Sequence, residues 1–191
     1  MGQSIHQLRP EVVTLLKAGV DVIGVDLFQQ GEFLTTGEAA NKTRRVKNPR
    51  EAAAYTFGYN RSVFSQRTHD VLTALRFART KGKGGQPVGI VALGSTGPIA
   101  AAARAIIPES FGVLALESGD FRFLQLTDLH DPSFQPAIAR YGDLPGLLEL
   151  CKPSPVRLIG GSSKIEGAAS LNNASDAVLW LKDELVRTVT H

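Results

Sequence analysis

One stretch of the chain, Val88–Ile107, constrains the fold more than any other. It opens with a short apolar run, passes through the glycine-containing turn Gly94–Gly97, and continues into a segment rich in alanine. An apolar run bounded by glycine is typical of a strand buried in a sheet, and alanine favours helix. A strand, a tight turn and a helix in succession are the pattern of α/β proteins. We therefore expect a mostly parallel sheet covered by helices on both faces.

Similar patterns recur along the chain and predict the other elements. Strands are expected at Val20–Val25, from Val88, at Gly112–Leu116 and at Val156–Gly160. Helices are expected at Pro10–Ala18, Asn60–Thr80, Gly97–Ile107, Pro145–Cys151 and Ser175–Thr188. Polar or irregular connections are expected at Gln29–Arg50, Gly119–Pro136 and Ser162–Asn173. This alternation, over 191 residues that are 43% hydrophobic, predicts one three-layer α/β domain spanning residues 1–191.

The turn after the Val88 strand has the layout of a nucleophile elbow, in which a serine sits on a sharp strand-to-helix turn. Such a turn needs small residues two places before and after the nucleophile, because the backbone is crowded there. With Ser95 as the nucleophile, Leu93 is too bulky. With Gly94 at that position, Ala92 and Thr96 fit, but no side-chain oxygen is present. In a simpler interpretation, Ser95 and Thr96 cap N–H groups of the helix.

Charge and composition exclude several classes of protein. The net charge is only +3, and no basic face with aromatic residues predicts a nucleic-acid site. No apolar run is long enough to span a membrane, and the N-terminal residues lack the apolar core of a signal peptide. We therefore expect a cytoplasmic protein, with a longer secreted parent as the open alternative.

Metal, disulfide and cofactor chemistry have little support in the sequence. Cys151 is the only cysteine, so it cannot form an internal disulfide, and its leucine neighbours predict burial. Asp128, His130 and Asp131 are close in sequence, but a polar turn before Pro132 explains them better than a metal site. We expect neither a metal nor a cofactor.

Five segments together resemble a known family. They are Gly24–Phe33, Tyr55–Arg61, His69–Leu75, Ala92–Pro98 and Arg140–Gly146. On these motifs the chain resembles the α/β-hydrolases of the acetyl xylan esterase-like and dienelactone-hydrolase-like kind, over almost its whole length. The resemblance implies an α/β-hydrolase fold, an ester substrate and a Ser-His-Asp triad.

The resemblance also indicates where the triad is to be sought. The nucleophile position falls on Gly94 or, less well, on Ser95, and Asp120 follows the next strand as a candidate acid. In this fold the catalytic histidine normally follows one more helix and one more strand after Val156–Gly160. Residues 161–173 contain no histidine and are too few for both elements, so we expect that segment to be missing. His130, flanked by carboxylates, is the candidate substitute.

The resemblance further implies a strand between the Val20–Val25 strand and the Val88 strand, and the sequence offers no candidate for it. We expect the sheet to close up without that strand, which gives a reduced hydrolase core. An exposed sheet edge would favour a homodimer, because unpaired strand groups recruit partners.

Two functions from different classes follow, and a third fits poorly. In the first, Ser95 attacks an ester carbonyl, His130 is the base, Asp120 or Asp131 orients it, and the N–H groups of Thr96 and Gly97 hold the oxyanion.

In the second, the protein is a non-catalytic relative that binds a small anionic ligand or a partner protein at Gly94–Gly97, since helix N-termini attract anions. A nucleotide site fits less well, because no lysine follows the turn and the dinucleotide-binding glycine pattern is incomplete.

Overall fold

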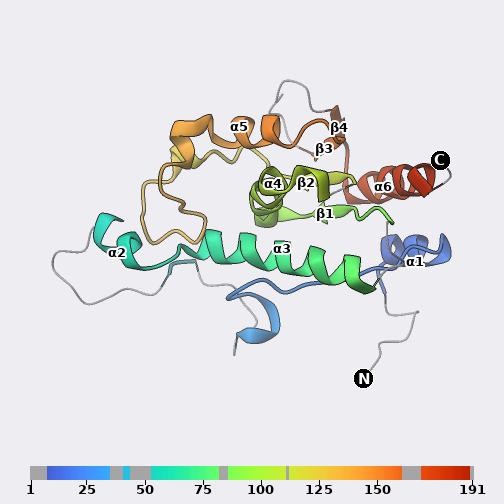
Figure 1. Cartoon of the computed structure of the whole chain (residues 1–191), viewed down its shortest axis with the longest axis horizontal. Coiled ribbons are helices and arrows are strands. Elements are labelled where there is room, and N and C mark those ends of the chain that lie inside the picture. Colours follow the sequence, from blue (N-terminus) through green and yellow to red (C-terminus); the bar gives the residue numbers. More distant parts are fainter. Residues whose placement is uncertain are drawn as a thin grey trace.

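The centre of the computed structural model is a parallel sheet of four strands in the order β1-β2-β3-β4 (Figure 1). The structure describes residues 8–34, 41–43, 53–81, 86–110, 112–160 and 169–189. The strands are β1 (Ile90–Ala92), β2 (Leu114–Glu117), β3 (Val156–Ile159) and β4 (Ala169–Leu171). Each pairs in parallel with the next. The parallel sheet predicted from the sequence is confirmed, as are the strands expected after Val88, after Gly112 and from Val156.

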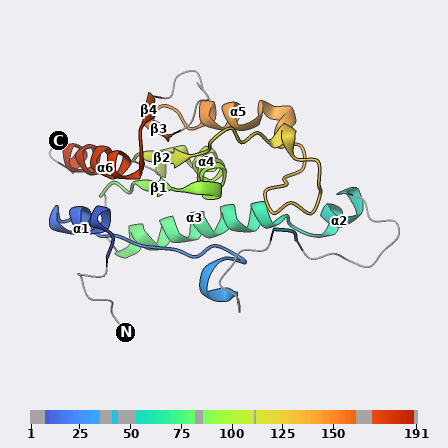
Figure 2. The same ribbon diagram turned by 180° about the vertical axis from the view of Figure 1, so that it is seen from behind.

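Helices cover both faces of this sheet, as Figures 1 and 2 show from opposite sides. They are α1 (Pro10–Lys17), α2 (Ala53–Tyr59), α3 (Val63–Lys81), α4 (Gly97–Ile106), α5 (Asp143–Leu150) and α6 (Ala174–Val189). Helix α4 lies against β1 and β2 and is flanked by α3 and α5, whereas α6 packs on the sheet and against α1. The five helices expected from the sequence are present; α2 is an addition.

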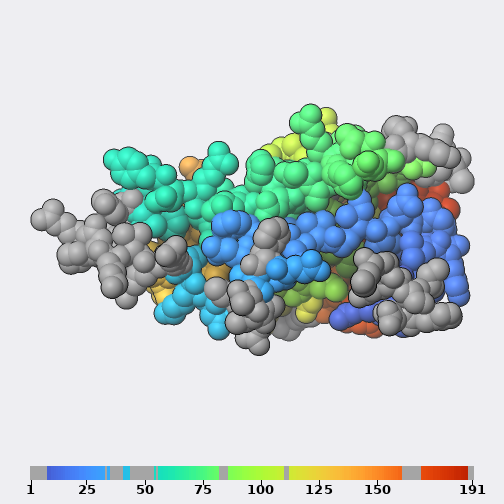
Figure 3. All heavy atoms as spheres, turned by 90° about the horizontal axis from the view of Figure 1, so that it is seen from below, coloured from blue at the N-terminus to red at the C-terminus, as the bar shows by residue number. Residues whose placement is uncertain are grey.

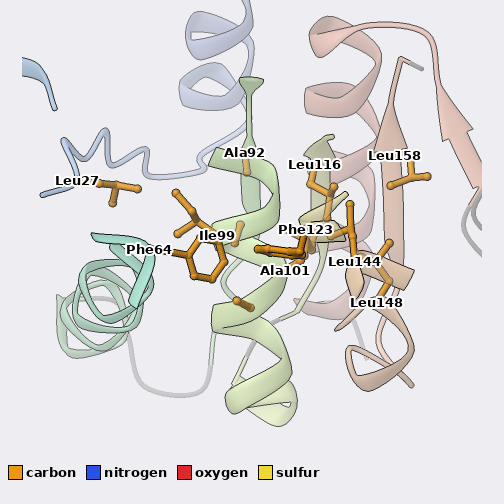
Figure 4. Close-up of a cluster of buried hydrophobic side chains, with 13 residues drawn as sticks. Leu27, Phe64, Ala92, Ile99, Ala101, Leu116, Phe123, Leu144, Leu148 and Leu158 are labelled. Atoms are coloured by element: carbon orange, nitrogen blue, oxygen red, sulfur yellow. The ribbon is translucent and has the colours of Figure 1, made fainter. Parts of the chain in front are cut away.

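The alternation of side chains along β2 explains why both faces are buried. Leu114 and Leu116 join the cluster that includes α4 and α5, whereas Ala115 packs with Ala177 of α6 on the other face. Successive strand residues point to opposite faces, so a strand covered on both sides must be apolar throughout. In Figure 4, Phe64, Ile99 and Phe123 fill the space between α3, α4 and the loop that follows β2.

One predicted strand is wrong. Val20–Val25 has no regular secondary structure, and Val22, Ile23 and Val25 are exposed. Its blue atoms lie on the surface beside the green atoms of α3 in Figure 3. The expected closing of the sheet therefore fails in one respect: β1 is the end of the sheet in the described part of the chain, and Val20–Val25 does not pair with it. The segment lies opposite the edge of β1 but forms no backbone hydrogen bonds with it among the described residues, so it is not a strand of the sheet.

The segment expected to be only a polar loop also departs from prediction. Its last residues form β4, which pairs with β3 through Arg157 and Ala169. The segment has room for a strand because β4 is only three residues long. Its residues Ala169 and Ser170 are exposed, so the sequence has no apolar pattern from which this strand could be predicted. Residues 161–168 lie outside the described residues. Asn172 and Asn173 follow β4 directly, at the position where the family resemblance implies a histidine.

No helix in the described part of the chain combines the length and the apolar character that a membrane crossing requires.

Candidate functional site

The turn from β1 to α4 is built on a glycine in the left-handed conformation. Gly94 has φ +57°, and a Cβ placed on it would meet nothing within 4 Å. Glycine reaches this region without the steric penalty that other residues pay. Gly94 is therefore the left-handed residue of the turn, and Ser95 follows it within the 3-10 turn Gly94–Thr96.

Thr96 stabilises the same turn from inside. Its N–H and its hydroxyl both donate to the carbonyl of Leu93, at 3.3 and 2.7 Å. No side-chain cap forms at the start of α4, so the simpler interpretation of Ser95 and Thr96 as caps is wrong. The threonine closes a single turn of 3-10 helix, Gly94–Thr96, instead.

Helix α4 begins unusually close to β2. A Cβ on Gly97 would lie 1.8 Å from the carbonyl oxygen of Glu117, a distance that only glycine permits. This approach brings the carboxyl end of β2 beside the turn.

Glu117, the last residue of β2, therefore lies beside the turn between β1 and α4. Its Oε2 accepts a hydrogen bond from the N–H of Gly94 at 2.8 Å. Glu117 was not among the site residues predicted from the sequence. The signal was available, because the residue ends an apolar run, and the carboxyl ends of adjacent parallel strands meet at one edge of the sheet.

A pocket of about 230 Å³ opens at this edge. Its polar groups are the carboxylate of Glu117 and the hydroxyls of three serines, and Phe121 adds an aromatic ring. The lining residues are Gly94, Ser95, Pro98, Glu117, Ser118, Gly119, Phe121 and Ser133. The turn therefore faces a small cavity that carries one formal negative charge, from Glu117, among serine side chains and apolar surface.

The structure places the predicted triad residues in different surroundings. Ser95 is exposed and lines the pocket. Asp120 and His130 do not line it. The imidazole Nδ1 of His130 lies 3.5 Å from the hydroxyl of Thr43, and its backbone N–H donates to Asp128 at 2.9 Å. The turn thus brings Ser95 together with Glu117, while His130 contacts another loop.

Two carboxylates close to His130 stabilise the loop in which they lie. Asp128 forms an ion pair with Lys42 at 2.9 Å, and the hydrogen bond from Lys42 lowers the pKa of that carboxyl. Asp131 accepts a hydrogen bond from the N–H of Ser133 at 2.8 Å. Among the described residues, no group of three or more histidine, cysteine, aspartate or glutamate side chains is arranged to hold a metal ion.

Several residues in the segments of family resemblance hold loops in place. Asp70 accepts from the N–H of Phe28 at 2.7 Å, and the guanidinium of the buried Arg67 donates to the Phe28 carbonyl at 2.9 Å. Asp26 accepts from the N–H of Glu32 at 3.0 Å. These bonds fix the loop that follows the Val20–Val25 segment.

Asp143 plays the same part for the loop beside the pocket. The carboxylate is buried and accepts from the N–H groups of Phe123 and Leu124, each at 2.9 Å. Phe121, which lines the pocket, packs edge-to-face on Phe123 with ring centroids 4.9 Å apart. Asp143 is therefore a positioning residue for the aromatic side of the pocket.

Comparison with protein-family models, with curated proteins and with solved structures found no match for this chain. The class of protein established by the structure is thus an α/β protein with a parallel sheet covered by helices.

Proposed function

We propose that this protein is a non-hydrolytic relative of the α/β-hydrolases. We propose further that the pocket beside the Gly94–Thr96 turn, which we call the elbow pocket, binds a small hydroxyl-bearing ligand of monosaccharide size. The observation that carries the proposal is the pairing of Gly94 with Glu117. The turn position offers no side-chain nucleophile, and its N–H is held by a carboxylate at 2.8 Å.

This carboxylate argues against ester hydrolysis at the turn. Acyl transfer builds negative charge on the carbonyl oxygen and needs N–H donors that are free to hold it. The N–H groups expected to hold the oxyanion, those of Thr96 and Gly97, already donate to the carbonyls of Leu93 and Gly94. Glu117 holds the neighbouring N–H of Gly94, so an oxyanion at this turn would also face a like charge. Two such charges about 4 Å apart repel by about 4 kcal/mol near a protein surface, which corresponds to a rate loss of about a thousandfold.

The Glu117 carboxylate also determines which kind of ligand the pocket can bind. A carboxylate accepts hydrogen bonds from hydroxyls and repels anions, and the serine hydroxyls can donate or accept. Phe121 supplies an apolar face for the carbon skeleton of a sugar or polyol. Sites for drug-sized ligands occupy about 300–1,000 Å³, so a pocket of about 230 Å³ suits a smaller molecule. A neutral polyol fits this lining better than the anionic ligand expected from the helix N-terminus alone.

Ester hydrolysis by Ser95 is the second candidate, because the Ser95 side chain is exposed and lines the same pocket. It requires His130 or another base to reach that hydroxyl, and Asp120 to orient the base.

Ligand-observed NMR with xylose, glucose and glycerol tests the proposal, with acetate as an anionic probe. Wild type is expected to bind at least one of the neutral probes and not acetate. Glu117→Gln keeps the shape of the side chain but removes its charge, and should weaken binding about tenfold to a hundredfold, as expected for a lost charge-assisted hydrogen bond.

The exposed Glu109, in the short 3-10 helix Pro108–Ser110, supplies the matched control, and Glu109→Gln should bind like wild type. Tighter binding of acetate than of every neutral probe would contradict the proposal. So would equal binding of the neutral probes by wild type and Glu117→Gln.

A further inference from the structure

A second and larger hollow lies at the free edge of the sheet. It has a volume of about 670 Å³ and separates β1 from the extended segment Val20–Ile23. Leu15 of α1 and Leu181 of α6 line it on one side, and Ala78 of α3 contributes from another element. We call it the edge groove. It is distinct from the elbow pocket, since the two share no lining residue.

The backbone of β1 faces the edge groove with unused hydrogen-bonding groups. Ile90 uses its N–H toward β2, donating to Val113 at 3.0 Å. Because N–H and C=O groups alternate in direction along a strand, those of Val91 point away from β2, toward the groove. In the described part of the chain, no hydrogen bond links Val91 to the Val20–Ile23 segment. Such an edge is a template for another strand.

The opposite wall of the edge groove, formed by residues 20–23, also has unpaired backbone groups. Within the described residues, the backbone N–H groups of residues 21–25 have no hydrogen-bond partner. Val22 and Ile23 expose 39% and 48% of their surface, and Leu93 of the facing wall exposes 39%. Two extended walls, each with unpaired peptide groups, border one groove, and their side chains are apolar except for Asp21.

The geometry points to a specific occupant: we propose that the edge groove receives one extended aliphatic peptide strand, which pairs with β1 and carries acidic residues at one end. The wall Val88–Leu93 corresponds to about 20 Å of extended chain. Helices already cover both faces at this edge, so the strand would be buried on both sides and must be apolar.

The acidic end follows from the charges on the rim. Arg79 and Lys81 end α3 and line the groove together with Gln86 and Val88, at the amino end of β1. The other charged residues that line the groove are Arg9 and Glu11 at the start of α1 and Asp21 in the opposite wall. An acidic residue in the bound strand would meet Arg79 and Lys81 at low desolvation cost, because both are exposed.

A small apolar molecule is a poorer occupant. It would fill the volume, but it would bury the peptide groups of Val91 without giving them partners, which is unfavourable. A peptide strand satisfies these groups and covers the exposed valine and isoleucine side chains at the same time.

Fluorescence polarisation with a labelled peptide tests the proposal. The probe is fluorescein-Glu-Glu-Val-Ile-Val-Ile-Val-Ser-amide, and its control has proline in place of the central valine. The full chain is used throughout. Wild type should bind the probe, and it should bind the proline control at least tenfold more weakly, because proline cannot donate to a strand ladder.

Two substitutions at one position separate backbone pairing from side-chain contact. Val91→Pro removes the N–H that faces the groove and leaves the hydrogen bonds to β2 intact, whereas Val91→Ala shortens the side chain and keeps the N–H. Binding should fall at least tenfold for Val91→Pro and stay within about threefold of wild type for Val91→Ala. Circular dichroism checks that both fold.

If Val91→Pro does not fold, Ile23→Asp provides the second test. Ile23 is half exposed, so the change is tolerated by the fold, but it puts a carboxylate against an apolar, acid-flanked strand. Binding should again fall at least tenfold.

Three results would overturn the proposal. The first is the absence of peptide binding to wild type. The second is equal binding by the Val91→Pro and Val91→Ala proteins. The third is a wild-type homodimer in sedimentation that the Val91→Pro change dissociates, since the groove would then hold a second copy of this chain.

Discussion

A single methyl group added at Gly97 tests how closely α4 approaches β2. In Gly97→Ala the new Cβ would stand 1.8 Å from the carbonyl oxygen of Glu117. Real contacts of this kind are not shorter than 3.0 Å, so the helix or the strand must retreat by more than an ångström. Neither moves freely, because Ala101 and Ala103 of α4 have no exposed surface and Leu114 of β2 is equally enclosed.

The expected cost follows from this enclosure. Overpacking of a filled interior costs about 1–3 kcal/mol. Alanine has a higher helix propensity than glycine, which offsets this cost by less than about 1 kcal/mol at the first position of a helix. We expect a net loss of about 2 kcal/mol in the free energy of unfolding, which lowers Tm by about 4–8 °C for a chain of this size.

Urea unfolding followed by circular dichroism measures this loss, and Gly24→Ala is the control. A Cβ on Gly24 meets nothing within 4 Å, so that variant should stay within about 0.5 kcal/mol of wild type. Equal stability of the Gly97→Ala and Gly24→Ala proteins would refute the close approach that brings Glu117 to the turn.

Three further substitutions or conditions test other parts of the structure. Gly94→Ala should lower stability by about 1–2 kcal/mol through its positive φ alone, since the site is open; unchanged urea unfolding would contradict this. Asp143→Asn weakens the acceptors of the Phe123 and Leu124 N–H groups and should cost roughly 3 kcal/mol in the same assay; a loss below the error of the assay would show that the carboxylate does not hold the loop. Burial raises the pKa of the Cys151 thiol from 9.0 to about 11, so the contribution of this group to stability should be present below pH 9 and lost as the pH rises toward 11; in the folded protein Cys151 should react with a thiol reagent at pH 8 only as fast as the chain unfolds, and rapid native-state labelling would contradict its burial.

Sequence patterns predicted the elements that lie in the interior. Val88–Ile107 gave a strand, a turn and a helix because its apolar and small residues are needed on both faces of a covered sheet. The turn itself was also predictable, because Gly94 lies where the strand ends and has the positive φ that glycine favours; the choice between Gly94 and Ser95 as the nucleophile position stays a prediction.

Sequence patterns failed where structure depends on a distant neighbour. Val20–Val25 has the composition of a strand, but strand formation requires a paired edge, and no described segment pairs with it. For β4 the opposite is true. Its residues are exposed and have no strand pattern, but they form a strand because the edge of β3 is there to pair with them.

The candidate site shows the same limit. Ser95 was predicted from its place in the turn, and it does line the pocket. Glu117 is 23 positions from Gly94 and meets it only because the strands are adjacent and Gly97 allows the approach. The roles assigned to Asp120 and His130 stay predictions, because they depend on contacts with a substrate.

Hydrolysis of p-nitrophenyl acetate by wild type and Ser95→Ala tests the central claim most directly. Ser170→Ala, which alters an exposed serine of β4, is the matched control. With Gly94 at the turn and Glu117 on its N–H, the three proteins should release p-nitrophenol at one common rate, that of the buffer. A rate above buffer that is lost in Ser95→Ala and kept in Ser170→Ala would contradict the account and establish Ser95 as a nucleophile.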